Sequence, residues 1–453
     1  AVRGGRRTLF MYARSSKALS KGRAAQTSPF AQQVRTAKLL RWDSDTRMSR
    51  QMEDLIEARD FLAFCLENQD SFTRRDWLAS LTLLTTRRHL DIGPHLRSPP
   101  TAASGGSAGG IDRLPPQSTC AASFAAYNEA VLKRVSLFED SLHLLIHRYG
   151  VLSYSPALWR LSGYVESRVA GMAMAKVALT AWGLAKALVS HEDVWRQIGR
   201  QVTVRTDELG GIDAAMLAWS FARIERRKPA EILALKTRIT ALLNNGSAES
   251  SSQLTAQDLC MAFRAFASLT PRDTAFLSAL LAATRRLADE ERVALPSQGL
   301  TSLWSALADL GQAGWRDDNA IEWLCEESRR LRLDHTFNQN MVAEIALAVR
   351  QLQVRDPRIV YQLVHWVDKK GECLRAEQLL TVVDVFSSMD INHEGAWKRL
   401  GTRVQRAAIE LDMADIQRIL QAFEHVGQLN DRVRGVLSLF ISTKGDEMAY
   451  GTT

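Results

Sequence analysis

The feature that most constrains this chain is an apolar stripe that returns at a nearly constant interval. In residues 213–224, the side chains of Ala214, Leu217, Phe221 and Ile224 stand at i, i+3, i+7 and i+10. This spacing places them on one face of a helix. If Phe221 is taken as an anchor, the same pattern recurs around Leu184, Phe266, Leu307, Val349, Phe386 and Phe423. The chain therefore contains seven copies of one helical unit.

The positions around these anchors are apolar in nearly every copy. Seven residues before them stand Val177, Ala214, Leu259, Leu300, Val342, Leu379 and Ile416, and four before them stand Thr180, Leu217, Ala262, Leu303, Ile345, Val382 and Ile419. The anchors are 37, 45, 41, 42, 37 and 37 residues apart, an interval that holds two helices and two turns. One helix pair cannot bury such a stripe, but stacked pairs cover one another. We therefore predict an all-α fold, an alpha-solenoid of stacked helical hairpins, with seven clear repeats and one or two degenerate N-terminal units.

The same alignment predicts the second helix of each hairpin. It should follow the anchor by about eleven residues, near Trp195, Leu277, Val360 and Trp397. Residues that favour helix starts stand at the expected places, namely Asp193, Pro229, Asp273, Asp317 and Asp356 with Pro357. An Asp side chain accepts hydrogen bonds from the unpaired amide N–H groups of a first helical turn, and Pro has no amide N–H that would be left unpaired there.

Composition divides the chain into further segments. Residues 1–42 form a basic N-terminal arm, and residues 43–96 a helical unit with one helix at 52–66 followed by Trp77, Leu81 and Leu84 in first-helix positions. The Gly-, Ser- and Pro-rich stretch 97–119 is expected to be a flexible linker. Residues 120–170 are a degenerate repeat, residues 171–440 the repeat array, and residues 441–453 a polar C-terminal tail.

The positive charge is concentrated at the N-terminus. Residues 1–42 contain no Asp or Glu and ten cations, Arg3, Arg6, Arg7, Arg14, Lys17, Lys21, Arg23, Arg35, Lys38 and Arg41. Subtracting these ten from the formal net charge of +8 leaves −2 for the rest of the chain. An acid-free, Arg-rich segment is typical of a mitochondrial or plastid presequence. The alternative is an arm that lies along a phosphate backbone and releases condensed counterions.

Several classes of protein find no support in the sequence. The motifs of hydrolases, P-loop proteins, zinc proteases and kinases are absent, so we expect no enzyme, no cofactor and no small-molecule substrate. Glu139, His143 and His147 are spaced as three metal ligands on one helix would be, but no fourth ligand is near, and we expect no metal site. No segment is apolar enough to insert into a membrane. The five cysteines form no C-x-x-C pair, which favours reduced thiols.

A second group of cations recurs with the repeat. Near the end of the second helices stand Arg200, Arg238, Arg285, Arg286, Arg329, Arg330, Lys369, Lys370, Arg403 and Arg406. Equivalent positions of a regular stack line one edge, so these side chains are candidate ligands of a phosphate backbone. Cations at helix C-termini also interact favourably with the helix dipole, and the sequence leaves both explanations open.

Three stretches resemble a known repeat motif. They are Leu217-Ala-Trp-Ser-Phe-Ala-Arg-Ile224, Ala181-Trp-Gly-Leu-Ala-Lys186 and Leu303-Trp-Ser-Ala-Leu-Ala-Asp-Leu-Gly311. They are similar to the Leu-Trp-Ala-Leu-Ala-x-Leu-Gly signature of octotricopeptide and heptatricopeptide repeats, which occur in organelle RNA-binding proteins such as FAST-kinase-like and RAP-domain proteins. The resemblance covers residues 171–440, although Trp304 is displaced by one position and the RAP domain is missing. It implies a mitochondrial or plastid protein that acts on RNA.

These observations lead to one main hypothesis and two alternatives. The main one is a non-enzymatic, RNA-binding structural subunit of a mitochondrial ribosome, of the kind found in protists, whose partners are organelle rRNA and neighbouring ribosomal proteins. The basic arm and the edge cations would bind the RNA. The alternatives are a scaffold or accessory subunit of a protein-only mitochondrial complex, and a free organelle factor for RNA processing or stability.

Overall fold

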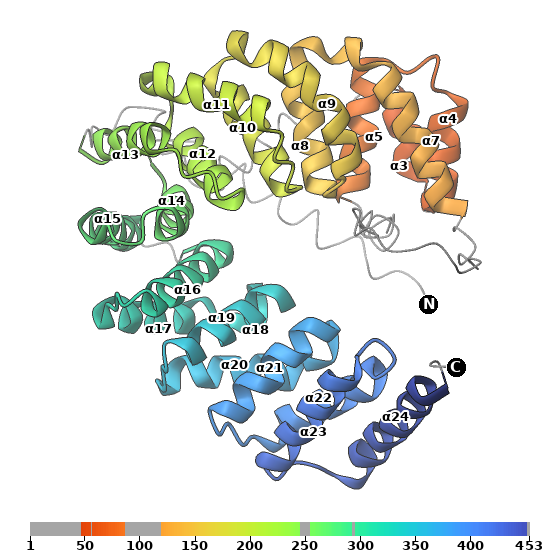
Figure 1. The fold of residues 1–453 in the computed structure, drawn as a ribbon, viewed down its shortest axis with the longest axis vertical. Helices are drawn as coiled ribbons and strands as arrows, with labels where there is room; N and C mark the ends of the chain where they lie inside the picture. The colour runs from red at the N-terminus through yellow and green to blue at the C-terminus, as the bar shows by residue number, and fades with distance from the viewer. Residues whose placement is uncertain (1–46, 56, 87–118, 245–253, 292–294, 451–453) are drawn as a thin grey trace, which may run out of the picture. The chain divides into compact units, whose positions relative to one another are not determined.

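The computed structural model describes residues 47–55, 57–86, 119–244, 254–291 and 295–450. These residues form helices and the turns between them, with no strand in the described ranges. The helices belong to one compact unit, Asp43–Thr453, and are coloured along the chain in Figure 1. The basic arm 1–42 and most of the linker 97–119 lie outside the described residues.

The repeats are helical hairpins, as the periodicity predicts. The first helices, called A helices here, are α8 (Leu142–Leu152), α10 (Met174–Lys186), α12 (Gly211–Arg223), α14 (Ala256–Leu269), α16 (Ser297–Gln312), α19 (Gln339–Gln351), α21 (Ala376–Ser388) and α23 (Met413–His425). The second, or B, helices are α9 (Ser155–Arg168), α11 (Glu192–Val204), α13 (Pro229–Asn244), α15 (Thr274–Glu291), α17 (Asp318–Leu331), α20 (Pro357–Lys370), α22 (Glu394–Ala407) and α24 (Asp431–Tyr450).

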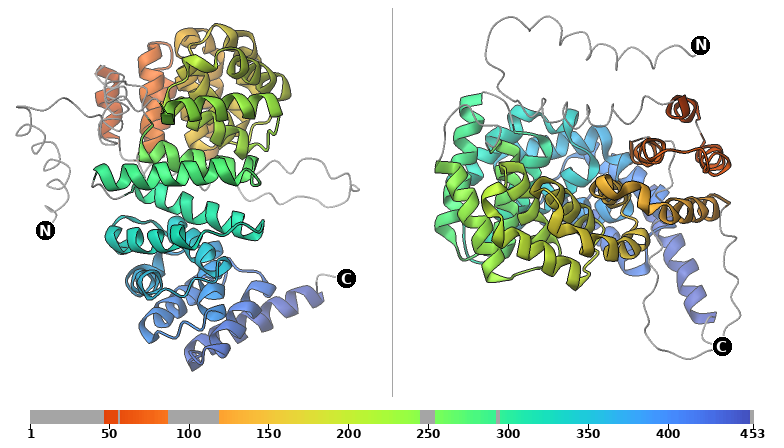
Figure 2. Two further views of the ribbon diagram at one scale, coloured as in Figure 1. Left: turned by 90° about the vertical axis from the view of Figure 1, so that its left-hand side faces the viewer. Right: turned by 90° about the horizontal axis from the view of Figure 1, so that it is seen from above.

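Each A helix packs on the next A helix along the chain, from α8 to α23. Figure 1 shows α10, α12 and α14 in one layer and α11, α13 and α15 in the other, and the left view of Figure 2 shows successive helices of the array stacked on one another. The B helices α9, α11 and α13 pack in series, as do α17, α20, α22 and α24. The fold is therefore an alpha-solenoid.

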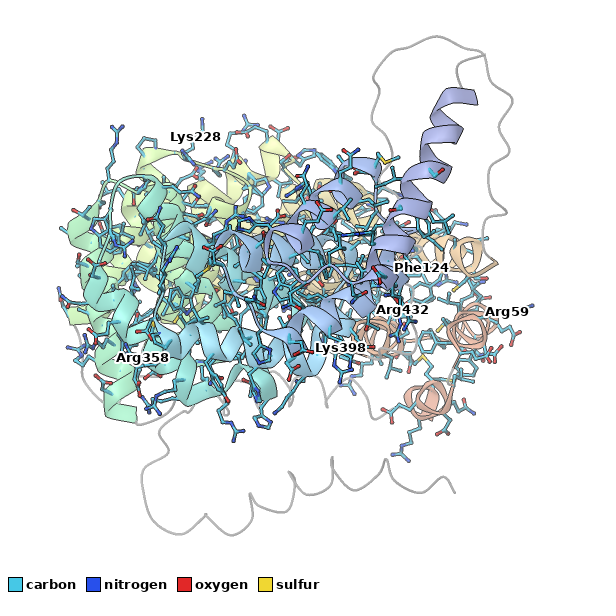
Figure 3. All side chains as sticks on the ribbon, turned by 90° about the horizontal axis from the view of Figure 1, so that it is seen from below. Arg59, Phe124, Lys228, Arg358, Lys398 and Arg432 are labelled. Atoms are coloured by element: carbon cyan, nitrogen blue, oxygen red, sulfur yellow. The ribbon has the colours of Figure 1, made fainter. Side chains whose placement is uncertain are left out.

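The core consists of the predicted stripe. All seven anchors are at most 2% exposed, and so are the side chains four and seven residues before them, including the polar Thr180. The expected second-helix residues Trp195, Leu277 and Trp397 are also buried. Most charged side chains lie outside this core, although a few, such as Asp258 and Glu327, are buried. Lys228, Arg358 and Lys398 lie at the surface of the array in Figure 3. Burial of one stripe by the next thus holds the stack together.

One turn geometry recurs after the A helices, and the sequence did not indicate it. The residue four positions after the anchor has a positive φ at Ser153, Leu188, Glu225, Gln353, Asp390 and Gly427. The carbonyl oxygen of the preceding anchor accepts a hydrogen bond from the amide five residues later, for example Arg226 N to Phe221 O at 2.8 Å. This is a left-handed helix cap. Because only one of these six residues, Gly427, is a glycine, the sequence marks the cap in one repeat and not in the other five.

The helix starts agree with the prediction. Asp317 and Asp356 accept hydrogen bonds from the backbone amides of Ala320 and Arg358, and Asp273 accepts one from Phe276. Pro229 is the first residue of α13. An additional short helix, α18 (Leu333–Thr336), lies between α17 and α19.

The single helix predicted at 52–66 is wrong. The chain forms α3 (Arg47–Asp54) and α4 (Ala58–Glu67), followed by α5 (Arg74–Thr86), α7 (Thr119–Lys133) and the 3-10 helix η2 (Val135–Ser141). The Cys65 thiol lies 3.8 Å from the Met52 sulfur, whereas 13 residues of continuous helix would separate them by about 20 Å. The chain turns so that both helices reach one core. The predicted side chains Trp77, Leu81 and Leu84 of α5 are buried.

At the C-terminus, residues 441–450 continue α24, so the boundary placed at 440 does not coincide with the end of a helix. The five cysteines carry free thiols, with Cys65, Cys260 and Cys325 buried. In the described ranges no helix has both the length and the apolar character that crossing a bilayer requires.

The anchors should dominate stability. Phe221 is 0% exposed and packs edge-on against Trp195, with ring centroids 6.1 Å apart. Phe221→Ala should lower the free energy of unfolding by about 3–5 kcal/mol through lost burial and the resulting cavity. Urea denaturation followed by circular dichroism measures this. Leu233→Ala is the control, because Leu233 is 61% exposed and should change stability by about 0.5 kcal/mol or less. Equal losses in both variants would contradict the role of the stripe.

Candidate nucleic-acid interface

Each A helix has a face that lies opposite its buried stripe. If the anchor is position 0, the buried positions are −7, −4 and 0, while positions −5, −2 and +2 point away from them. We call the surface formed by these three positions in successive A helices the A face. Tyr149 is the anchor of α8, since it is buried and its carbonyl makes the same cap to Tyr154. Because the A helices pack in order, equivalent positions form rows across the array.

An aromatic row crosses the first three A helices at position −2. It consists of His147 on α8, Trp182 on α10 and Trp219 on α12, all partly exposed. The rings of His147 and Trp182 stack with centroids 4.9 Å apart and an interplanar angle of 26°. Those of Trp182 and Trp219 are 6.0 Å apart at 28°. Three successive repeats thus present a continuous stack of π-systems at one surface.

Two glycines allow the first of these stacks to form. A Cβ atom on Gly150 of α8 would lie 2.5 Å from the Cα atom of Gly183, and one on Gly183 would lie 2.7 Å from the carbonyl oxygen of Ile146. The backbones of α8 and α10 therefore approach more closely than side chains would permit. Gly183 directly follows Trp182, so the close approach also brings the rings of Trp182 and His147 together.

Apolar and basic side chains surround the aromatic row. Position −5 holds Leu144, Leu179, Met216 and Met261 in the helices α8 to α14, all partly buried. Position +2 holds the exposed Lys186 and Arg223, and the Lys186 ammonium lies 6.0 Å from the centroid of the Trp182 ring. Position −2 of α14 is Arg264. None of the three A-face positions in α8 to α14 is a carboxylate.

The character of the A face changes after α14. The same positions in α16, α19 and α21 include the carboxylates Asp309, Glu344 and Asp384. Arg264 of α14 and Asp309 of α16 form an ion pair at 2.6 Å, and Arg418 of α23 pairs with Asp384. Burial raises the pKa of Glu344. The first part of the A face is therefore aromatic and basic, and the second part is polar and acidic.

The two histidines of α8 are electrically neutral at pH 7. Burial and, to a smaller degree, the ammonium of Lys176 together lower the pKa of His143 to about 4. Burial likewise lowers the pKa of His147 to about 4, with Arg148 and His143 as smaller causes. Glu139, which is spaced with the two histidines as a third metal ligand would be, instead forms an ion pair with Arg168 at 3.0 Å. The described residues contain no group of three or more His, Cys, Asp or Glu side chains that could hold a metal ion. His147 therefore acts as a flat aromatic ring.

Several edge cations predicted from the sequence make structural contacts on the B side of the array. The Arg238 Nε donates to the carbonyl oxygen of Leu209 at 2.8 Å, and the Arg403 Nε donates to that of Leu374. Both carbonyls stand two residues before an A helix of the same hairpin. Arg205, which the prediction did not include, makes the same contact with Met172 at 2.8 Å. These guanidinium groups tie the end of a B helix to the start of its A helix.

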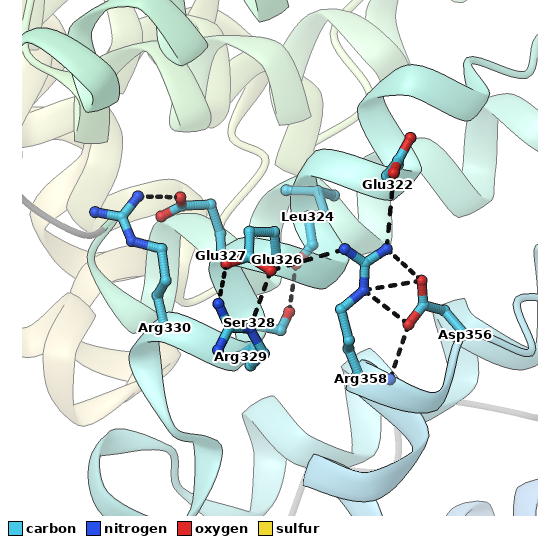
Figure 4. Close-up of polar contacts among 9 residues, drawn as sticks. All are labelled: Glu322, Leu324, Glu326, Glu327, Ser328, Arg329, Arg330, Asp356 and Arg358. Atoms are coloured by element: carbon cyan, nitrogen blue, oxygen red, sulfur yellow. Dashed lines mark hydrogen bonds and ion pairs between the residues drawn. The ribbon is translucent and has the colours of Figure 1, made fainter.

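Other edge cations pair with carboxylates. Arg329 pairs with Glu326 and Arg330 with Glu327, as Figure 4 shows beside the ion pairs of Arg358. Arg406 pairs with Glu372 at 2.9 Å. Arg286, Lys369 and Lys370 also interact with neighbouring groups, whereas Arg200 and Arg285 are exposed. Contact of this edge with RNA stays a prediction, and so does the role of the arm cations, which lie outside the described residues.

Comparison with known proteins adds no family to this picture. No protein-family model matches the chain, and no curated protein sequence matches it. The resemblance to octotricopeptide and heptatricopeptide repeats therefore stays a prediction that depends on the motifs around Trp182, Trp219 and Trp304.

The glycine contact can be tested with a matched pair of variants. Gly183→Ala places a methyl group 2.7 Å from the Ile146 carbonyl, so it should lower the free energy of unfolding by about 1–3 kcal/mol. Gly163→Ala on α9 meets nothing within 4 Å and should raise it by about 0.5–1 kcal/mol, because alanine favours helices. Urea denaturation measures both. Stabilisation by both changes would show that α8 and α10 do not need the close approach.

The two partly buried histidines of α8 predict a pH dependence of stability. Their pKa is lower in the folded state, about 4, than the ordinary value of 6.5, so the folded chain binds fewer protons than the unfolded chain. Stability is therefore full above pH 6.5 and is lost as pH falls toward 4. At pH 5 the loss should be up to about 2 kcal/mol per histidine, reduced by solvent screening of the partly exposed rings. Urea denaturation at pH 7 and pH 5 should show a smaller loss for His143→Gln/His147→Gln than for the wild type. An identical loss would exclude these histidines as the cause.

Proposed function

We propose that this protein is a non-enzymatic RNA-binding helical-repeat protein that takes up single-stranded RNA on the A face of α8 to α14. The observation that carries the proposal is the stacked row of His147, Trp182 and Trp219, which is flanked by cations and has no carboxylate at the A-face positions of α8 to α14. Proteins that bind single strands combine aromatic platforms for the bases with positive charge for the backbone. Both are present together on this surface.

Each part of the surface has a physical role in this proposal. Phosphates would lie near Lys186 and Arg223, which are exposed on the same side of the aromatic row. Bases would contact the rings and the apolar side chains of Leu179 and Met216. The carboxylates Asp309, Glu344 and Asp384 would repel phosphates beyond α14. A neutral His147 adds stacking surface without charge, consistent with its lowered pKa.

The cellular setting is the finer part of the proposal. We infer a structural subunit of a mitochondrial ribosome, with a plastid as the alternative, in contact with rRNA and neighbouring ribosomal proteins. Support comes from the resemblance to organelle repeat proteins and from the ten cations of residues 1–42. Sedimentation of the native protein should place it with ribosomal particles and shift it after RNase treatment. A free RNA factor would sediment well below ribosomes without RNase.

A second candidate is a scaffold of a protein-only complex, favoured by the acidic second part of the A face. Salt distinguishes the two. RNA affinity should fall steeply between 50 and 200 mM salt, because phosphate contacts release counterions, whereas an apolar protein interface should respond little. Crosslinking with sequencing tests the same point, and recovery of no RNA at the A face, the edge cations or residues 1–42 would favour the scaffold.

The A-face cations should determine part of this salt dependence. Lys186→Ala/Arg223→Ala should weaken binding of a ten-nucleotide RNA and reduce the slope of log affinity against log salt by about 1.4, since each phosphate contact on a single strand contributes about 0.7. Fluorescence anisotropy with the full chain measures this. Lys398→Ala/Arg432→Ala removes the same charge from exposed positions outside the A face and should leave the slope unchanged. Equal slopes in both variants would remove the A face from the binding site.

A further inference from the structure

The aromatic row ends at Trp219, and its end has a distinct geometry. Neighbouring rings of the row are stacked face to face, with interplanar angles of 26° between His147 and Trp182 and 28° between Trp182 and Trp219. Trp219 is stacked with Trp182 on the α10 side, and no other aromatic ring of the described residues contacts it. Its remaining face is therefore directed toward α14, where the next position of the row is Arg264.

Arg264 is held in place from the far side. Its Nη1 atom lies 2.6 Å from the Oδ2 atom of Asp309, which belongs to α16 rather than to α12. The guanidinium is thus anchored away from Trp219. About a third of the Arg264 side chain and half of the Asp309 side chain remain exposed, so this end of the row is open to a ligand. A guanidinium is flat and stacks on aromatic rings as well as carrying charge.

We infer that Trp219 and Arg264 form a nucleobase-binding subsite, in which one base of a single-stranded RNA lies between the indole and the guanidinium. This inference rests on the proposed RNA-binding function and specifies where a base is held. Arginine planes and aromatic side chains are the usual stacking partners of unpaired RNA bases. Asp309 is a positioning residue, because it fixes the guanidinium without touching the base.

A base inserted between two neighbouring A helices needs a gap of defined width. Packed helices lie about 8–10 Å apart, and a base between two flat groups needs about 7 Å, twice the 3.4 Å stacking distance. In the first two intervals of the row the side-chain rings already close this space, at 4.9 and 6.0 Å. The interval from α12 to α14 has an indole on one side only. Met216 and Met261 lie at position −5 of the same helices and provide an adaptable floor.

The first experiment removes the indole. Fluorescence anisotropy with the full chain would use fluorescein-labelled ten-nucleotide oligoadenylate and the same oligomer made abasic. Trp219→Ala should weaken oligoadenylate binding about 5- to 100-fold, as loss of one stacked base does, while Trp219→Phe should retain most of the affinity. The abasic oligomer should bind Trp219→Ala and wild type equally. The salt dependence of the wild type should persist in Trp219→Ala, because no charge is lost.

The second experiment separates the flat guanidinium from its charge. Arg264→Lys keeps the charge and should weaken oligoadenylate binding about three- to tenfold, because an ammonium cannot stack. Arg418→Lys is the matched control, since Arg418 also pairs with an A-face carboxylate, Asp384, but has no aromatic residue beside it in the row. It should leave affinity within about twofold of the wild type.

The outcomes distinguish the subsite from the function as a whole. If the wild type binds oligoadenylate and neither Trp219→Ala nor Arg264→Lys differs from Arg418→Lys, the subsite is overturned and RNA binding stands. If the wild type binds no oligomer at low salt, both proposals are overturned. Circular dichroism confirms that each variant is folded, and Trp219→Phe and Arg264→Lys keep a large side chain at these positions if the alanine variant does not fold.

Discussion

The array depends on one contact that every repeat makes, the burial of an anchor side chain between neighbouring hairpins. The anchor contributes twice, because its side chain fills the core and, in most repeats, its carbonyl accepts the hydrogen bond of the left-handed cap. The first effect joins successive hairpins, and the second fixes where the B helix turns back. A single hairpin could not bury its stripe alone, so order spreads from repeat to repeat.

Packing in register has a consequence for the opposite side of the A helices. Because each anchor sits against the next, every residue two positions before an anchor also falls beside its counterpart. That is why His147, Trp182 and Trp219 stack although at least 35 residues separate them along the chain. Where the residue type at this position changes, the surface changes with it, and Asp384 occupies in α21 the position that Trp182 occupies in α10. Residues at equivalent positions of successive repeats thus lie side by side and together form one surface.

The basic side chains of the array fall into two groups, those that make structural contacts and those that are exposed on the A face. In sequence, Arg238, Arg329 and Arg403 look alike, since each stands near the end of a second helix. In the fold, Arg238 and Arg403 hold backbone carbonyls at the start of their own hairpins, and Arg329 pairs with a carboxylate one turn away. An arginine that recurs at equivalent positions of the repeat can therefore have a structural role within each hairpin rather than a role in binding. The A-face cations Lys186 and Arg223 are exposed and stand beside aromatic surface instead.

The sequence by itself determined the fold class, the seven anchors, the positions of the B helices and most helix starts, because apolar periodicity and capping residues act locally. It did not determine the turn between α3 and α4, the left-handed caps at Leu188 or Glu225, or the aromatic row. Those features depend on which helices approach each other and how closely, as at Gly150 and Gly183, where two backbones meet. Distances between residues far apart in the chain are set only by tertiary packing, so a stack of three rings appears once the helices are assembled.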